Sequence, residues 1–303
     1  MKLFKQIFNS KAVLNKVSRD SELLKKLDPE EIRELQMCLF EIYHAVKRVC
    51  DKYNLRLFLI GGSALGAVRH HGFIPWDDDM DLSMTRSDFE VFSRVFEDEL
   101  SDEYVLNAPN YSALARNRFP LVMKKGTYYR TLIDSKHEEH HLINVEIFIL
   151  ENTPDSFLQR KVKGLVCNFL SLLSWEVFIW ENRNEQIKQY LKAAGTAGYI
   201  IRMAMGFLFS FRSSARWFDL YDRAIQYKDE HSACCCLPSG RKRYFGEIMR
   251  REQWLPGQYL DFEGEKVLVF SDMDPYLRNL YGDYMKIPPE KEREVHTACE
   301  IRI

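Results

Sequence analysis

The fold is decided by residues 57–83, which read LFLIGGSALGAVRHHGFIPWDDDMDLS. An apolar run at residues 55–60 predicts a short buried strand. A tight turn, Gly61-Gly62-Ser63, then leads into a helix of about two turns over residues 64–70. Leu82 opens a second apolar run, so we expect a second strand there, with four carboxylates at its start.

These carboxylates are Asp77, Asp78, Asp79 and Asp81. Because side chains alternate in an extended chain, we expect Asp77, Asp79 and Asp81 on one face and Asp78 on the other. Like charges at this spacing cannot all ionise without a cation between them. Oxygen ligands of this kind suit Mg²⁺ or Mn²⁺, which usually also bind substrate phosphates. The run therefore predicts a metal site for phosphoryl chemistry.

A solvated acidic loop is the plainer interpretation of the same run. The apolar residues 74–76 before the acids and Leu82 after them argue against it, because they hold the acids against a core. The Gly61-Gly62-Ser63 turn adds a second argument, since backbone N–H groups at a glycine-rich turn and helix start form a phosphate cradle. Turn and acids together indicate one site.

A third feature is Glu146, which stands inside the β-rich run of residues 143–150. A lone carboxylate in apolar surroundings is costly unless it is paired or bound to a metal. The alternative is an edge strand with Glu146 in water. We expect Glu146 to be the third carboxylate of the metal site, on a strand beside the aspartates.

The remaining pattern predicts alternating helices and strands. Asp28, Pro29 and Glu31 form a capping box before an amphipathic helix that ends at Asn54, and Thr85 caps a helix to Leu100. The sequence further predicts a hairpin of strands 119–123 and 127–131 around Lys124-Lys125-Gly126, helices over 154–227, short strands over 233–276, and an irregular tail from Tyr281.

Composition excludes some classes of protein. The 303 residues carry 43 basic and 44 acidic side chains, a net charge of −1, which disfavours nucleic acid as a partner. The seven cysteines have irregular spacing, which favours reduced thiols in a cytoplasm. Cys234-Cys235-Cys236 is interpreted as a buried strand, with a metal site as the alternative.

Two segments raise the question of a membrane. Residues 1–20 would gather Leu3, Phe4, Ile7 and Phe8 on one side of a helix with lysines around them, so an interfacial helix is one interpretation and a mobile or packed arm the other. Residues 196–211 are apolar but shorter than the roughly 20 residues that span a bilayer. We expect a buried or partner-facing helix there.

The chain resembles the LicD family of bacterial phosphocholine transferases, which has eukaryotic relatives of the fukutin-related kind. The resemblance is carried by residues 61–70, residues 72–81, and Tyr281-Gly282-Asp283-Tyr284-Met285 with Pro288-Pro289, and it covers roughly residues 30–297. It implies an α+β fold: a polymerase-β-type, nucleotidyltransferase-like mixed sheet flanked by helices, with an additional helical lobe.

The same resemblance sets the expected domain boundaries. Residues 1–27 form an N-terminal arm and residues 28–297 a catalytic domain. Within that domain we expect a nucleotidyltransferase core at 28–153, a helical lobe at 154–230, and C-terminal strands with a tail that completes the active site at 231–297.

The resemblance also implies roles for individual residues. Gly62 and Ser63 bind phosphate, Asp79 and Asp81 hold the metal, and Glu146 supplies the third acid, where the family more often has aspartate. Asp77 is a further candidate metal ligand, and Asp81, Glu146 or Asp77 is the general base.

Two further residues are candidate contacts of the substrate. Arg69 is expected to hold a phosphate oxygen, with an ordinary salt bridge as the alternative. Trp76 offers an aromatic face for a choline cation.

The implied reaction moves phosphocholine from CDP-choline onto a hydroxyl of a cell-surface glycan or lipid-linked oligosaccharide, such as lipopolysaccharide, teichoic acid or capsule, and releases CMP. Transfer of ribitol or glycerol phosphate from a CDP-activated donor is the first alternative. A nucleotidyltransferase that leaves the nucleotide on its acceptor and an inactive glycan-binding relative are the others. The expected location is the cytoplasm, with peripheral contact at the inner face of the membrane.

Overall fold

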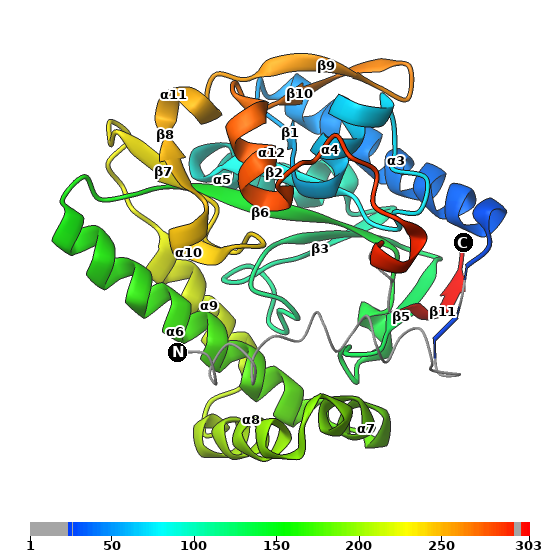
Figure 1. Ribbon diagram of the computed structural model, residues 1–303, viewed down its shortest axis with the longest axis vertical. Coiled ribbons are helices and arrows are strands. Elements are labelled where there is room, and N and C mark those ends of the chain that lie inside the picture. The colour runs from blue at the N-terminus through cyan, green and yellow to red at the C-terminus, as the bar shows by residue number, and fades with distance from the viewer. Residues whose placement is uncertain (1–23, 26, 294–297) are drawn as a thin grey trace.

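The computed structural model describes residues 24–25, 27–293 and 298–303 (Figure 1). The interfacial helix considered for the first 20 residues therefore lies outside the described residues. The described chain forms a mixed α+β structure around a nine-stranded sheet, with a separate two-stranded sheet.

The large sheet has the strand order β3-β4-β6-β2-β1-β10-β9, with β7 paired to β6 and β8 to β7. Its strands are β1 (Phe58–Leu59), β2 (Asp81–Thr85), β3 (Tyr104–Asn107), β4 (Leu121–Lys124), β6 (Asn144–Asn152), β7 (Cys234–Cys236), β8 (Ile248–Arg250), β9 (Gln258–Phe262) and β10 (Glu265–Val269). The pairs β2–β6 and β1–β10 are parallel and the other pairs are antiparallel. β6 is thus an interior strand, which excludes the edge-strand interpretation of Glu146.

Helices cover the sheet and extend beyond it (Figure 1). They are α3 (Pro29–Lys52), α4 (Gly61–His70), α5 (Arg86–Leu100), α6 (Phe157–Glu181), α7 (Glu185–Ala194), α8 (Thr196–Phe209), α9 (Ser214–Ile225), α10 (Arg243–Gly246), α11 (Arg251–Trp254) and α12 (Met273–Tyr281). α3 and α5 touch each other and the central strands, so they share one face of the sheet. The main core lies in this layer.

The sequence predicts α3 because its start and its buried face are both encoded locally. The side chain of Asp28 accepts hydrogen bonds from the backbone N–H groups of Glu30 and Glu31, and the carboxylate of Glu31 accepts one from the backbone N–H of Asp28, which completes the capping box. Leu35, Leu39 and Ile42 lie on the buried face. Thr85 caps α5 in the same way, through the N–H of Asp88.

Three expectations about local structure are wrong. α4 starts at Gly61, so Gly61-Gly62-Ser63 forms its first turn instead of preceding it. The 119–131 segment is no hairpin, because β4 pairs with β3 and β6 while β5 (Tyr128–Thr131) pairs with β11 (Ala298–Arg302) in the small sheet. The C-terminal part contains α12, which the apolar spacing Met273, Leu277 and Leu280 encodes and which we did not predict.

Two cysteine predictions are confirmed. Cys234-Cys235-Cys236 is strand β7, with Cys235 and Cys236 buried. All seven cysteines are free thiols.

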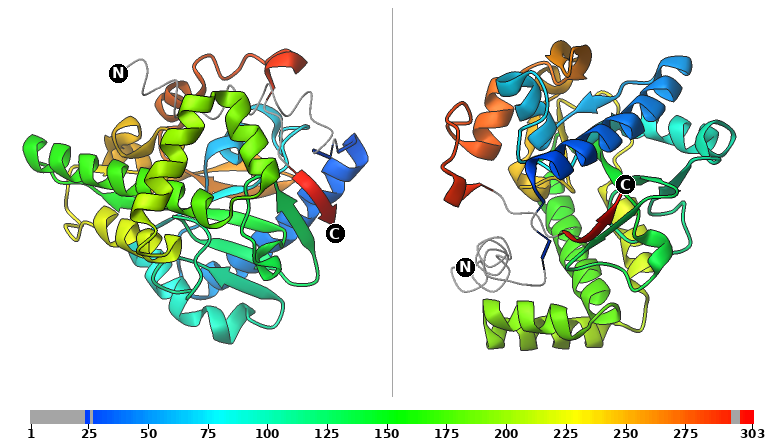
Figure 2. Two further views of the ribbon diagram at one scale, coloured as in Figure 1. Left: turned by 90° about the horizontal axis from the view of Figure 1, so that it is seen from below. Right: turned by 90° about the vertical axis from the view of Figure 1, so that its right-hand side faces the viewer.

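Helices α6 to α9 lie at the end of the molecule farthest from β9 and β10, and α7 and α8 are outermost (Figures 1 and 2). α6 packs against α9 and α8, and α10 closes one side of it. This arrangement leaves β2, β6 and the start of α4 between the helical end and the C-terminal strands (Figure 1). The candidate site lies there.

Candidate active site

The centre of the site is a pair of carboxylates on neighbouring parallel strands. β2 and β6 pair so that Asp81 stands opposite Glu146. Val145 and Ile147, on either side of Glu146, are fully buried toward the core, so Glu146 points to the other face of the sheet. The expectation that Glu146 lies on the strand beside the aspartates is confirmed.

The first turn of α4 fixes Asp81 in place. The N–H of Gly62 donates to Oδ2 of Asp81 (3.2 Å), and the N–H of Asp81 donates to Oγ of Ser63 (2.9 Å). Gly61 has φ +54°, and a Cβ there would lie 2.2 Å from Oδ2 of Asp81. Glycine is required at this position for both reasons. The phosphate-binding role of Gly62 and Ser63 stays a prediction, and the structure adds that both also position Asp81.

Burial and mutual repulsion make this pair costly to ionise. Desolvation and then the charge of Asp79 raise the pKa of Glu146 to about 8, against the lowering effect of Arg116 and Arg118. The pKa of Asp81 is raised well above its ordinary value by desolvation first, and then by Asp79 and Glu146. Nearby carboxylates whose charges raise one another's pKa are the environment that a cation stabilises.

The other aspartates precede the strand, because β2 begins only at Asp81. Asp77 reaches the first turn of α4, where its Oδ2 lies 2.8 Å from the position of a Cβ on Gly62. Asp78 is buried and accepts a hydrogen bond from the hydroxyl of Tyr129 (3.1 Å). Asp79 is exposed, and its charge acts on Asp81 and Glu146. Asp78 thus differs from its neighbours in being buried against Tyr129, although its charge also helps to raise the pKa of Glu146.

The donor set fits a magnesium-type cation that shares its ligands with a substrate. No group of three or more His, Cys, Asp or Glu side chains within the described residues could hold a metal ion unaided. Mg²⁺ commonly takes only one or two carboxylates together with water and substrate phosphates. Asp81 and Glu146 are of the right chemistry for that arrangement, and metal binding by them and by Asp77 and Asp79 stays a prediction.

Arg69 and Trp76 contact the C-terminal tail. Nη1 of Arg69 donates to the backbone carbonyl of Tyr284 (2.6 Å), and the charge of Asp77 acts on the same guanidinium. Trp76 is half-buried, and the guanidinium of Arg293 lies 3.9 Å from its ring centroid. The ring of Trp76 therefore holds a cation, although that cation belongs to the protein.

Three functional candidates were not assigned roles from the sequence. The hydroxyl of Tyr276 accepts the N–H of Gly61 (3.1 Å), and the charges of Asp81 and Asp77 help to raise the pKa of Tyr281, after burial. Tyr281 is the first residue of the motif Tyr281-Gly282-Asp283-Tyr284-Met285, and this motif was the signal in the sequence that could have identified it. Tyr276 belongs to the unpredicted α12, so its apolar spacing was the signal there.

Arg118 is the third candidate. Its Nε is buried without a hydrogen-bond partner in the described part of the chain, and its charge acts on Glu146. Its guanidinium lies 6.0 Å from the ring centroids of Phe119 and Trp175. A buried cation that lacks a carboxylate partner is suited to an anionic ligand. The only signal in the sequence is its position just before strand 119–123.

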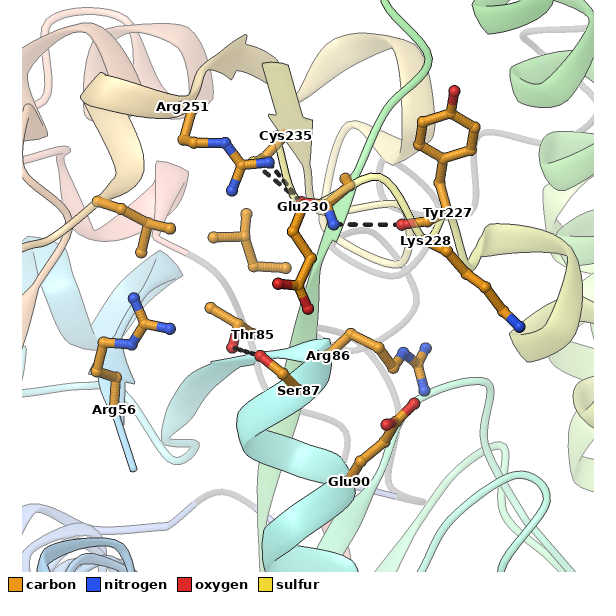
Figure 3. Close-up of a pocket in the computed structure, with 13 residues that line it drawn as sticks. Arg56, Thr85, Arg86, Ser87, Glu90, Tyr227, Lys228, Glu230, Cys235 and Arg251 are labelled. Atoms are coloured by element: carbon orange, nitrogen blue, oxygen red, sulfur yellow. Dashed lines mark hydrogen bonds between the residues drawn. The ribbon is translucent and has the colours of Figure 1, made fainter. Parts of the chain in front are cut away.

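A cavity of about 550 Å³ lies at the C-terminal ends of β2 and β6, at the other end of these strands from Asp81 and Glu146 (Figure 3). Thr85, Arg86 and Asn152 are among the residues that line it. Its arginines are already bound inside the protein: Arg86 pairs with Glu151 and Asp222, and Arg251 binds Ser232 and Asn152. We assign no ligand to this cavity.

Comparison with known proteins finds a family match for the segment that contains Asp81 and Glu146. Residues 54–162 match the family described as LicD/FKTN/FKRP, nucleotidyltransferase domain. The lipopolysaccharide cholinephosphotransferase LicD of Haemophilus influenzae is 27% identical over 296 residues, which are 92% of this chain and 100% of that protein. An uncharacterized protein of Rickettsia prowazekii is 26% identical over 121 residues, 38% of this chain and 46% of its own.

The first prediction concerns pH. Because the folded pKa of Glu146 is raised, its contribution to stability is present below the ordinary value of 4.5 and is lost as pH rises to about 8. In EDTA, Tm should therefore fall over this interval, and less steeply in Glu146→Gln. At pH 8 Mg²⁺ should raise Tm of the wild type by about 3 °C or more and that of the variant by less. Glu34→Gln, on the exposed side of α3, is the control. Identical pH profiles for all three proteins would contradict the repulsive pair.

The second prediction separates backbone strain from contact with Asp81. Gly61→Ala should destabilise more than Gly264→Ala, since Gly264 has φ +82° but open space around it. In an Asp81→Ala background the two glycine substitutions should destabilise the protein equally. The coupling energy between Gly61→Ala and Asp81→Ala, measured by denaturant unfolding, should be about 1 kcal/mol or more. Additive effects would show that Gly61 does not position Asp81.

Proposed function

We propose that the chain is a metal-dependent phospho-alcohol transferase, because residues 54–162 match the family described as LicD/FKTN/FKRP, nucleotidyltransferase domain, and a LicD cholinephosphotransferase is 27% identical over 92% of the chain. The observation that carries the proposal is the pair Asp81 and Glu146 beside the Gly61-Gly62-Ser63 turn, all within the matched segment. The donor we favour is CDP-choline, and the acceptor is a hydroxyl of a cell-surface glycan or its lipid-linked precursor. Support comes from the name of the Haemophilus relative and its end-to-end match.

In the proposed reaction the acceptor oxygen attacks the phosphorus that carries the alcohol. The bond from that phosphorus to the bridging oxygen of the pyrophosphate breaks, and CMP leaves with the electron pair. The hydroxyl proton passes to a carboxylate, for which Asp81 and Glu146 are the candidates because they lie side by side in the sheet. The in-line geometry is typical of phosphoryl transfer.

The residues around the pair have complementary roles. Asp81 and Glu146, with Asp77 and Asp79 beside them, would hold a Mg²⁺ or Mn²⁺ ion, which would supply positive charge against the pyrophosphate. Because the N–H groups of Gly61 and Gly62 already donate to Tyr276 and Asp81, the first turn of α4 would bind a phosphate oxygen through Ser63, and Arg118 would pair with a second anionic group of the donor. The polymerase-β-type arrangement and the cytoplasmic location stay predictions.

Choline remains the favoured head group because of Trp76. The Trp76 ring already holds the Arg293 guanidinium on its face, so a choline cation would bind there by displacing that guanidinium. Ribitol or glycerol phosphate would instead need hydrogen-bonding groups at the same place. The segment that carries Arg293 would have to move away from Trp76 for choline to bind. The preference for CDP-choline over other CDP-alcohols therefore tests whether choline uses the Trp76 ring.

The third prediction tests the function itself. Purified protein with Mg²⁺ should release CMP from CDP-choline in the presence of a glycan acceptor, and faster than from CDP-ribitol or CDP-glycerol. Asp81→Asn should slow release by roughly 100-fold or more with Tm unchanged or raised. A preference for CDP-ribitol would contradict choline as the head group and would still support a phospho-alcohol transferase. No turnover with any CDP-alcohol would favour the inactive, glycan-binding alternative.

The fourth prediction concerns Arg118. Arg118→Met should raise KM for the CDP donor about 10- to 100-fold, the loss of a charge-assisted hydrogen bond, while Arg118→Lys keeps part of the affinity. Tm should stay constant or rise, because an unpartnered buried charge is removed. Arg278→Met, which breaks an exposed pair with Asp274, is the matched control. A lower Tm with unchanged KM would mean that Arg118 only supports the fold.

A further inference from the structure

Helix α8 turns its apolar side outward. Its exposed stripe consists of Ile200, Ile201, Ala204, Phe207 and Leu208, and Phe211 continues it. Phe207, Leu208 and Phe211 are 65%, 67% and 75% exposed. These positions recur at intervals of three and four residues, so they form one continuous line along the helix. An ordinary surface helix has the opposite orientation, with its apolar side in the core.

The inner side of α8 explains why this orientation is fixed. Arg202 is buried there and forms an ion pair with Glu176 of α6 at 2.9 Å. Gly206 packs so closely that a Cβ would lie 2.5 Å from the side chain of Trp180. Rotating the helix to bury its apolar stripe would expose that contact and separate a buried charge pair, which costs several kcal/mol. The outward stripe is therefore part of the fold.

Basic side chains surround the stripe. Residues 182–217 contain six basic residues and a single acidic one, although the whole chain has a net charge of −1. Arg202 is the buried partner of Glu176 and Lys188 pairs with Glu185, which leaves Arg183, Lys192, Arg212 and Arg216. Within the described residues Arg183, Lys192 and Arg212 pair with no carboxylate and lie instead over the rings of Trp180, Tyr199 and Trp217. Basic groups on aromatic rings beside an apolar stripe are typical of helices that lie in a membrane interface.

We propose that α8, with the adjoining turn to Phe211, docks in the plane of an anionic lipid bilayer. The apolar stripe enters the boundary between headgroups and acyl chains, and Arg183, Lys192, Arg212 and Arg216 contact acidic headgroups. Docking involves no spanning segment: in the described chain α6 alone is long and apolar enough to cross a bilayer, and half of its apolar window is packed inside the protein. α7 and α8 form one end of the molecule in Figure 1 and in the right-hand view of Figure 2, so α8 lies where an external surface can reach it.

We expected a buried or a partner-facing helix at residues 196–211. The exposed stripe excludes a fully buried helix, so the partner-facing alternative is the one that we keep, with a lipid surface as the partner. The charge pattern selects a lipid surface over a second copy of the chain, because two copies meeting through α8 would bring their basic rims together. The inference does not rest on the proposed function, since it needs neither donor nor acceptor.

Flotation of the full chain with lipid vesicles tests the proposal. The protein should float with phosphatidylcholine vesicles that contain phosphatidylglycerol, less with phosphatidylcholine alone, and less at high salt. Phe207→Glu with Leu208→Glu should weaken binding about tenfold or more. Arg212→Glu with Arg216→Glu should weaken binding to the acidic vesicles and abolish the dependence on lipid charge. Tyr259→Glu, 65% exposed on β9, is the matched control and should bind as the wild type does.

The outcomes are distinguishable. Circular dichroism and Tm establish that each variant is folded, which we expect because the substituted side chains are exposed. Full binding by the Phe207→Glu, Leu208→Glu protein would overturn the proposal, because another part of the chain would then bind the membrane. Absence of vesicle binding by the wild type, with a dimer that this variant dissolves, would overturn it in favour of a second copy. Asp81→Asn should still bind vesicles, so a failed transferase assay leaves the membrane result intact.

Discussion

The parallel pairing of β2 with β6 is the constraint on which the rest of the site depends. It places Asp81 opposite Glu146 in the interior of a sheet, where neither carboxylate is well solvated. Two hydrogen bonds with the first turn of α4, through Gly62 and Ser63, hold Asp81 in this position and offset part of the unfavourable desolvation. Buried carboxylates that raise one another's pKa are typical of a functional site.

The surrounding elements extend this constraint outward. Tyr276 of α12 accepts the N–H of Gly61 at the start of α4, and Arg69 near the end of α4 donates to the carbonyl of Tyr284, so α12 and the C-terminal tail are tied to the two ends of this helix. A tail fixed at these two points brings Tyr281 to the aspartates. On the other side, Arg118 supplies a buried positive charge near Glu146. Segments more than 200 residues apart in sequence thus build one site.

The outward stripe of α8 gives the molecule a second, independent constraint. The buried pair Arg202 and Glu176 fixes the helix with its apolar residues exposed, at the end of the molecule farthest from β9. If the acceptor is a lipid-linked glycan, docking of this end on a bilayer would confine enzyme and acceptor to one surface. The two sites would then cooperate through location, without any change in the fold.

The sequence by itself determined the features whose causes are local. The capping box of Asp28, the Thr85 cap and the acidic run behind Gly61-Gly62-Ser63 each depend on residues a few positions apart, and they predicted α3, α5 and the position of the site. Only the tertiary structure decided which strands pair: β5 joins β11 instead of β4, and β6 meets β2 in the register that aligns Asp81 with Glu146. It also decided the burial of Arg118 near Glu146 and the direction of the α8 stripe. Periodicity identifies an apolar face, but distant partners decide whether that face is buried, because burial depends on contacts that no local pattern encodes.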